Sequence, residues 1–143
     1  MPKLEEIYEM IATDFVINET QLVAETTRSS DLFIKYIRLW SNEKLKVQQL
    51  ENRKNLLVRQ KRAYYAGDGT PEEYKKKPFA LKIKTETEMQ KYLAGDEDIL
   101  AFEEGVIIQR QKVDILDACV KEIKGRGYQI KNIIEHKKFE SGW

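Results

Sequence analysis

The chain has little of the residue types on which disulfides, metal sites and membrane spans depend. It contains one cysteine, Cys119, and one histidine, His136, among 143 residues. A single cysteine allows no disulfide within one chain, and these two residues cannot assemble the His/Cys cluster of a transition-metal site. No run approaches the ~20 apolar residues of a membrane-spanning helix, and the first residues lack the regions of a signal peptide. We expect a soluble protein of a reducing compartment, with no cofactor and no membrane contact.

Residues that could carry out catalysis are also missing. The sequence contains no GxxxxGK[ST] phosphate loop, and no nucleophile has a base nearby in sequence. The acidic string at residues 96–98 resembles a metal-binding cluster, but anions in the first turn of a helix are expected from the helix dipole. We therefore predict a binder or scaffold that is not an enzyme, with no catalytic residue and no metal.

Hydrophobic periodicity predicts an all-α fold. The composition, 41% hydrophobic and 34% charged with seven Gly and three Pro, is that of a charge-rich helical protein, and its length suits one structural unit. Several helix starts are marked by a capping residue with Glu or Gln three positions later, as in Thr70–Glu73. The predicted helices lie at about residues 4–11, 19–65 (capped by Asn18), 71–77, 85–94 and 97–124, with a turn at Gly125-Arg126-Gly127 before a last helix.

The second predicted helix is too long to bury its apolar stripe inside a small monomer. At 1.5 Å per residue, a helix from 19 to 65 exceeds the diameter of a small domain, although Ser41-Asn42 could interrupt it. The subunit is therefore expected to be elongated and to complete its core by oligomerising. The last helix has a one-sided apolar set that would either cap its own bundle or bind a neighbour, and the pattern alone favours neither: Ile130, Ile133, Ile134 and Phe139.

Charge is unevenly distributed along the chain, although the net charge is only +1. Residues 1–34 carry net −5, residues 35–84 carry net +9, and residues 85–143 carry net −3. Such segregation concentrates positive potential on one part of the surface, while the acidic ends maintain solubility. A basic middle with acidic flanks predicts one polyanion-binding surface per subunit.

The basic block is densest at about residues 53–65, where five cations precede the adjacent Tyr64 and Tyr65. Cations on a helix bind phosphates and aromatic faces stack on unpaired bases, so this pairing suggests single-stranded nucleic acid. The alternative is a solvated basic helix face whose two tyrosines pack at its end. The candidate DNA-binding cations are Arg53, Lys54, Arg59, Lys61 and Arg62, and Lys75, Lys76 and Lys77 form a second cluster.

Several strings resemble, in order and spacing, the UvsY family of recombination mediators of T-even-type bacteriophages. The resemblance runs from about Asn18 onward, and none of the strings is a fingerprint by itself. They are Tyr64-Tyr65-Ala66-Gly67-Asp68-Gly69, Ala94-Gly95-Asp96-Glu97-Asp98-Ile99-Leu100, Leu116-Asp117-Ala118-Cys119, Ile123-Lys124-Gly125-Arg126-Gly127-Tyr128-Gln129-Ile130-Lys131-Asn132-Ile133 and Phe139-Glu140-Ser141-Gly142.

The resemblance implies a specific function. Members bind single-stranded DNA, form a ring-like homo-oligomer (hexamer or heptamer), and load the phage recombinase, UvsX, onto strands coated by the phage single-stranded-DNA-binding protein. This occurs in phage recombination, recombination-dependent replication and repair, without nucleotide hydrolysis, in the cytoplasm of the infected bacterium. The family's basic-x-basic DNA contact falls on Arg59-Gln60-Lys61, with the two cations in the order opposite to the usual one, and Arg62 is an additional cation.

The resemblance also suggests a division of labour along the chain. Residues 1–84 would carry the single-stranded DNA-binding segment, and residues 85–143 would hold the oligomer together through the last helix. The alternative is a helical oligomeric scaffold protein with a basic surface and no mediator role.

Overall fold

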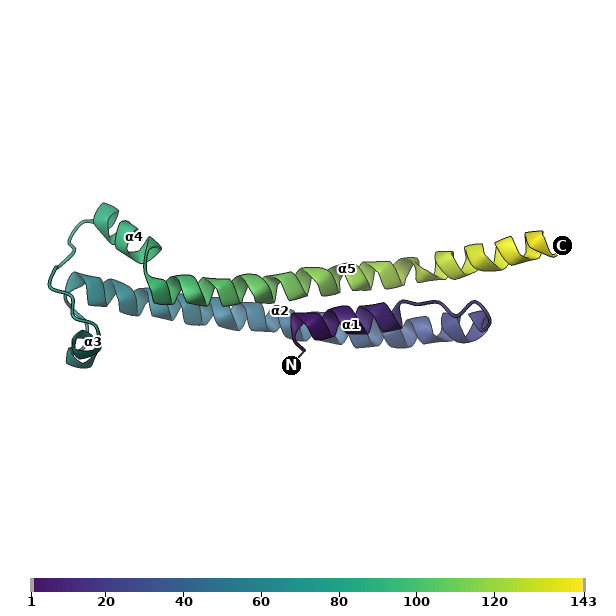
Figure 1. Cartoon of the computed structure of the whole chain (residues 1–143), viewed down its shortest axis with the longest axis horizontal. Helices are drawn as coiled ribbons and strands as arrows, with labels where there is room; N and C mark the ends of the chain where they lie inside the picture. Colours follow the sequence, from purple (N-terminus) through teal and green to yellow (C-terminus); the bar gives the residue numbers. More distant parts are fainter. Residues whose placement is uncertain (1, 143) are drawn as a thin grey trace. The chain divides into compact units, whose positions relative to one another are not determined.

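The computed structural model describes residues 2–142, which form helices and no strand (Figure 1). The predicted all-α class is therefore confirmed. No helix in this range is long and apolar enough to cross a membrane. The elements are α1 (Leu4–Asp14), α2 (Leu22–Ala66), α3 (Pro71–Lys76), α4 (Glu86–Ala94) and α5 (Glu97–Glu140).

Local sequence signals account for the ends of α2 and α3. Gly67 follows α2 with a φ of +89°, a left-handed conformation that glycine adopts without the strain of a side chain. At the start of α3, the Thr70 side chain accepts a hydrogen bond from the backbone N–H of Glu73, and the Glu73 carboxylate bonds back to Thr70. This capping box was predicted from the sequence and is confirmed.

The predicted start of the second helix is wrong by three residues. Asn18 does not cap α2, because its side-chain oxygen accepts from the backbone N–H and the hydroxyl of Thr20, at 3.0 and 2.6 Å. This arrangement is a local turn that asparagine side chains favour, and α2 begins only at Leu22. From there the helix runs for 45 residues, and Ser41-Asn42 does not interrupt it.

The predicted turn at Gly125-Arg126-Gly127 is also wrong, since α5 continues through it as one helix of 44 residues. Each glycine costs roughly 1 kcal/mol relative to alanine inside a helix, so the sequence favours a break on local grounds. The Arg126 side chain opposes the break, because it is almost fully buried and is bonded to Ser29 and Glu25 of α2.

The structure divides into two compact units, and both long helices contribute to each of them. Unit 1 comprises residues 1–45 and 110–143, and unit 2 comprises residues 46–109. The boundary predicted between residues 84 and 85 lies inside unit 2. The division of labour assigned to either side of that boundary stays a prediction.

The core of unit 1 forms where α1 packs on the first half of α2 and the second half of α5. Its buried residues include Ile7, Tyr36 and Cys119, so the one cysteine packs as a small hydrophobic side chain. The Tyr36 hydroxyl donates to Asp14 at 2.9 Å, and Lys35 bonds to the same carboxylate oxygen at 2.6 Å. Burial raises the pKa of Asp14, but the two hydrogen bonds together with the charges of Lys35 and Arg28 outweigh it and hold that pKa below its ordinary value.

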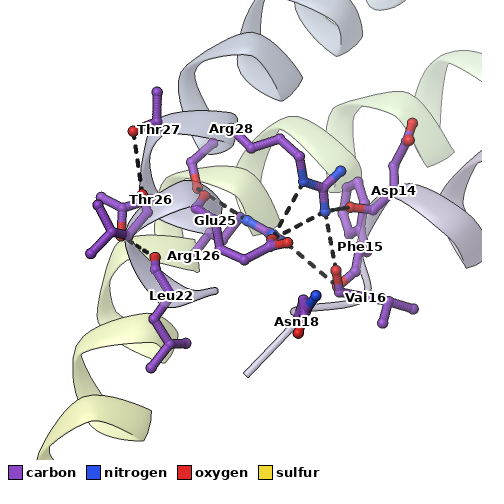
Figure 2. Close-up of polar contacts among 12 residues, drawn as sticks. Asp14, Phe15, Val16, Asn18, Leu22, Glu25, Thr26, Thr27, Arg28 and Arg126 are labelled. Carbon is purple, nitrogen blue, oxygen red and sulfur yellow. Dashed lines mark hydrogen bonds and ion pairs between the residues drawn. The ribbon is translucent and has the colours of Figure 1, made fainter. Parts of the chain in front are cut away.

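A buried ion-pair cluster ties the start of α2 to the second half of α5 in unit 1 (Figure 2). The Glu25 carboxylate lies between the guanidinium groups of Arg28 and Arg126. Arg28 also donates to the backbone oxygens of Asp14 and Val16, at 2.8 and 3.1 Å, which fixes the loop between α1 and α2. Because a buried charge is tolerated only when paired, each member of this cluster depends on the others.

Unit 2 is built around the end of α2, which α3, the loop after it and α4 enclose. Its hydrophobic core cluster consists of Tyr64, Tyr65, Ile83, Met89, Leu93 and Ile99. Asp96 caps the start of α5 through its side-chain oxygen, which accepts from the backbone N–H of Ile99 at 3.0 Å. The same carboxylate contacts the end of α2, so unit 2 brings the acidic start of α5 to the basic end of α2.

Candidate nucleic-acid interface

The predicted DNA-binding segment, residues 53–65, is helical throughout and forms the last turns of α2 in unit 2. Its two tyrosines are not available for base stacking. Tyr64 and Tyr65 are 4% and 7% exposed, and their rings pack against Tyr74, Phe79 and Tyr92. The stacking interpretation is therefore wrong, and the alternative that the tyrosines pack at the helix end is confirmed.

Hydrogen bonds from the tyrosine hydroxyl groups fix the helix end against the rest of unit 2. Tyr64 donates to the backbone oxygen of Lys77 at 2.5 Å, and Tyr74 donates to the backbone oxygen of Tyr64 at 2.7 Å. Tyr65 donates to the Asp96 carboxylate at 2.5 Å. Burial and this carboxylate raise the pKa of Tyr65 above its ordinary value, so its hydroxyl stays protonated as a donor. The cations that precede the tyrosines are thereby presented on a rigid helix end.

Lys61 is held inside a network of carboxylates. Its side chain is 15% exposed, with the ammonium nitrogen 2.6 Å from Asp98 and 3.4 Å from Asp96. Burial lowers the pKa of Lys61, but the two carboxylates outweigh it and raise that pKa above its ordinary value. The Lys61 charge is therefore retained, and it is already engaged within the subunit.

Two more of the predicted cations are also paired. Arg62 makes a two-pronged contact with Glu86, at 2.8 and 3.0 Å, and Lys54 pairs with Glu103. The hydrogen bonds from Arg62 and Gln90 lower the pKa of Glu86 to about 2. The carboxylate is thus ionised at neutral pH and competes for Arg62 with any other anion.

Arg53 and Arg59 differ from the other three cations. Both are exposed, and no ion pair or side-chain hydrogen bond is found for either among residues 2–142. Arg53 lies at a surface groove with Lys46, Gln49, Leu50 and Gln109, all of them in unit 2. Of the five predicted DNA-binding cations, these two are the ones that an incoming phosphate reaches without displacing a partner.

The second basic cluster is exposed as well. Lys75, Lys76 and Lys77 lie at the end of α3, and Lys82 and Lys84 follow in the loop before α4, all in unit 2. The Tyr64 hydroxyl holds the backbone of Lys77, so this cluster is attached to the same helix end as the first one. Unit 2 therefore carries both basic clusters that the sequence indicated.

Sequence reasoning missed the carboxylates that pair with the first cluster. Glu86, Asp98 and Glu103 lie 24 to 49 residues beyond their partners in the chain. The helix dipole alone accounts for the acidic string that contains Asp98, so the string does not by itself indicate a partner for Lys61. The charge blocks gave a partial signal, because a basic middle and an acidic end of the chain attract each other in the absence of any other partner.

The residues predicted to hold the oligomer together differ in exposure. In unit 1, Ile130 is 2% exposed, Ile133 and Ile134 are half-buried, and Phe139 is 82% exposed. Ile130 therefore belongs to the core of its own subunit. Phe139 is free for a neighbour, and the oligomerisation role of the set stays a prediction. No group of three or more metal-ligating side chains occurs within residues 2–142.

Comparisons with known proteins agree with the resemblance seen in the sequence. The profile of the family described as "Recombination, repair and ssDNA binding protein UvsY" matches residues 10–143. The recombination protein uvsY of Enterobacteria phage T4 is 26% identical over 140 residues, which is 98% of both chains. A crystal structure of the bacteriophage T4 recombination mediator protein UvsY superposes with a TM-score of 0.81 at 24% identity, over 97% of this chain and 99% of that one.

A second crystal form of the same T4 protein gives a TM-score of 0.80, over 99% of both chains. These structural similarities establish the fold, and the profile match covers nearly the whole sequence. The chain belongs to the UvsY family of recombination, repair and single-stranded-DNA-binding proteins.

Proposed function

We propose that this protein is a recombination mediator that binds single-stranded DNA through unit 2. It assists a phage recombinase of the UvsX type in loading onto strands coated by the phage single-stranded-DNA-binding protein, in the cytoplasm of the infected bacterium. The observation that carries the proposal is the family match over residues 10–143, and it is supported by the two unpaired arginines on the basic segment of α2 where the resemblance places the DNA contact. The protein acts by binding and not by catalysis.

Arg59 and Arg53 make the first contacts with the strand. They lie six residues apart on one helix, about 9 Å along its axis at 1.5 Å per residue. A guanidinium group donates to phosphate oxygens in a fork geometry and is always charged at physiological pH. Contacts of this kind recognise the phosphate backbone and not the bases, so binding is independent of sequence. Lys54, Lys61 and Arg62 contribute once they are released from their carboxylates.

The active form is a ring-like homo-oligomer, a hexamer or heptamer. Its support is the number of large apolar side chains that unit 1 leaves in solvent. Val23, Ile34 and Leu45 are 82%, 51% and 60% exposed and recur every eleven residues on α2, so they lie on one helix face. Exposed apolar side chains in such rows are typical of surfaces that bind another protein. Several weak phosphate contacts per subunit, repeated around a ring, would give tight total binding through effective concentration.

Loading of the recombinase tests the mediator role. The protein is added to single-stranded DNA coated by the single-stranded-DNA-binding protein, and the ATPase activity of the recombinase on that DNA is measured. Stimulation is expected at a stoichiometric ratio, with no ATPase activity from this protein alone. If the strand is bound but no ratio stimulates the recombinase, the helical scaffold protein with a basic surface becomes the better account.

A further inference from the structure

The carboxylates that pair with the basic segment belong to two classes. Asp96 is structural, because its side chain is 1% exposed, caps α5 and accepts the Tyr65 hydroxyl. Asp98 and Glu86 are 65% and 66% exposed. Asp98 makes no other ion pair among residues 2–142, and Glu86 also accepts a hydrogen bond from the exposed Gln90. Asp98 and Glu86 can therefore leave their cations without opening the core of unit 2.

The contact between Arg62 and Glu86 has the geometry that a phosphate would use. Two guanidinium nitrogens of Arg62 donate to two oxygens of one carboxylate, at 2.8 and 3.0 Å, as they would to two oxygens of a phosphate. Lys61 likewise presents its charge to Asp98 at 2.6 Å. A phosphate that takes the same donors of either cation replaces the carboxylate.

On the basis of the strand-binding function proposed above, we propose that Asp98 and Glu86 compete with the strand for Lys61 and Arg62 within the subunit. This competition sets the affinity of the site for polyanions and its preference for long polyanions over short ones. Arg53 and Arg59 anchor the backbone first, since they have no partner to displace. The anchored strand then presents further phosphates at high effective concentration, and these replace Asp98 on Lys61 and Glu86 on Arg62. A small anion lacks this advantage, so the carboxylates keep free phosphates and short oligoanions off the site.

The test compares two charge-neutralising variants with matched controls. The variants are Asp98→Asn and Glu86→Gln. Their controls are Glu104→Gln and Glu88→Gln, which remove an exposed carboxylate from the same two helices, and neither of these carboxylates forms an ion pair within residues 2–142. Each protein is titrated with an oligothymidylate of about ten nucleotides, a length within the usual site size of single-strand binders. Thermal unfolding of each free protein is recorded in parallel.

Asp98→Asn and Glu86→Gln should each bind about two- to fivefold more tightly than the wild type, which corresponds to the strength of ion pairs this exposed. The controls should shift affinity by less than half as much, because they change only the net charge. The melting temperature of the free protein should fall or stay constant in the two variants. A purely structural role would instead lower stability and affinity together.

A double variant separates competition from a general field effect. In a Lys61→Ala background, Asp98→Asn should give no further gain, because the cation that it would free is absent. An equal gain with and without Lys61 would overturn the competition. The competition would also be overturned if the wild type binds the oligonucleotide and Asp98→Asn and Glu86→Gln bind it with the same affinity as the wild type. That outcome would leave the proposed function intact. If neither the wild type nor the two variants bind, the proposed function is wrong and the competition is refuted with it.

Discussion

Replacing Arg126 tests whether α5 is one helix that is anchored by a buried ion pair. The Arg126 side chain is 4% exposed, donates to Ser29 at 3.0 Å and pairs with the Glu25 carboxylate, which is itself 10% exposed. Removing one partner of a buried pair costs about 3 to 5 kcal/mol of unfolding free energy. We expect Arg126→Ala to lie near the lower limit, about 3 kcal/mol, because Arg28 still contacts Glu25.

The corresponding fall in melting temperature is about 12 °C for a chain of this size. The loss of unfolding free energy is measured by urea unfolding at fixed protein concentration, followed by circular dichroism. Lys131→Ala, which changes an exposed residue of the same helix, is the control. That control should lie within about 0.5 kcal/mol of the wild type. If residues 125–127 formed a turn, Arg126 would be a surface residue and its variant would match Lys131→Ala. Equal midpoints for the two variants would refute the reasoning.

Three further predictions concern the tyrosine hydroxyl groups of unit 2, the buried carboxylates of unit 1 and the last turns of α5. Tyr65→Phe removes a hydrogen bond to a buried carboxylate and should lower the unfolding free energy by about 1.5 to 3 kcal/mol. Tyr64→Phe removes a hydrogen bond to a neutral carbonyl and should lower it by about 0.5 to 1.5 kcal/mol. Equal urea midpoints for the two variants would contradict a charged Asp96. Hydrogen bonds and ion pairs hold the folded-state pKa values of Asp14 and Glu25 below their ordinary values. The two carboxylates therefore stabilise the fold fully above their unfolded-state pKa values of about 4, and this stabilisation is lost as pH falls through the lower folded-state pKa values. The melting temperature should decline between pH 6 and pH 2, and a constant melting temperature would argue against both contacts. Phe139→Ser should shift sedimentation toward smaller species without lowering the stability of the subunit, because this side chain is exposed. Ile130→Ala should instead lower the unfolding free energy by about 2 to 5 kcal/mol, because its side chain is buried. Unchanged sedimentation of Phe139→Ser would exclude this side chain from the subunit contact.

Helix ends that depend on three or four neighbouring residues were predicted correctly from the sequence. The capping box at Thr70 and the end of the second helix at about residue 65 depend on neighbours in the chain, and the structure contains both. The helix-stopping effect of Gly125 and Gly127 was read in the same way, but it fails because a distant residue decides the outcome. Glu25 lies 101 residues from Arg126, and no local pattern indicates that pairing.

The candidate site shows the same limit. The basic segment and its helical state were evident from residues 53–65. The sequence did not reveal that Lys61 is held by Asp98, 37 residues away, while Arg59 remains exposed. It also could not decide between tyrosines that stack on bases and tyrosines that pack in a core, because that choice depends on how Phe79 and Tyr92 close over them.

The salt dependence of single-stranded DNA binding tests the central claim most directly. Each phosphate contact with a single strand contributes about −0.7 to the slope of log affinity against log salt concentration. Arg59→Ala should therefore flatten the slope by about 0.7 for each engaged subunit. Arg38→Ala, an exposed arginine on the same helix but in unit 1, should leave the slope unchanged. An unchanged slope in Arg59→Ala, with wild-type binding intact, would contradict the assignment of the strand to the end of α2.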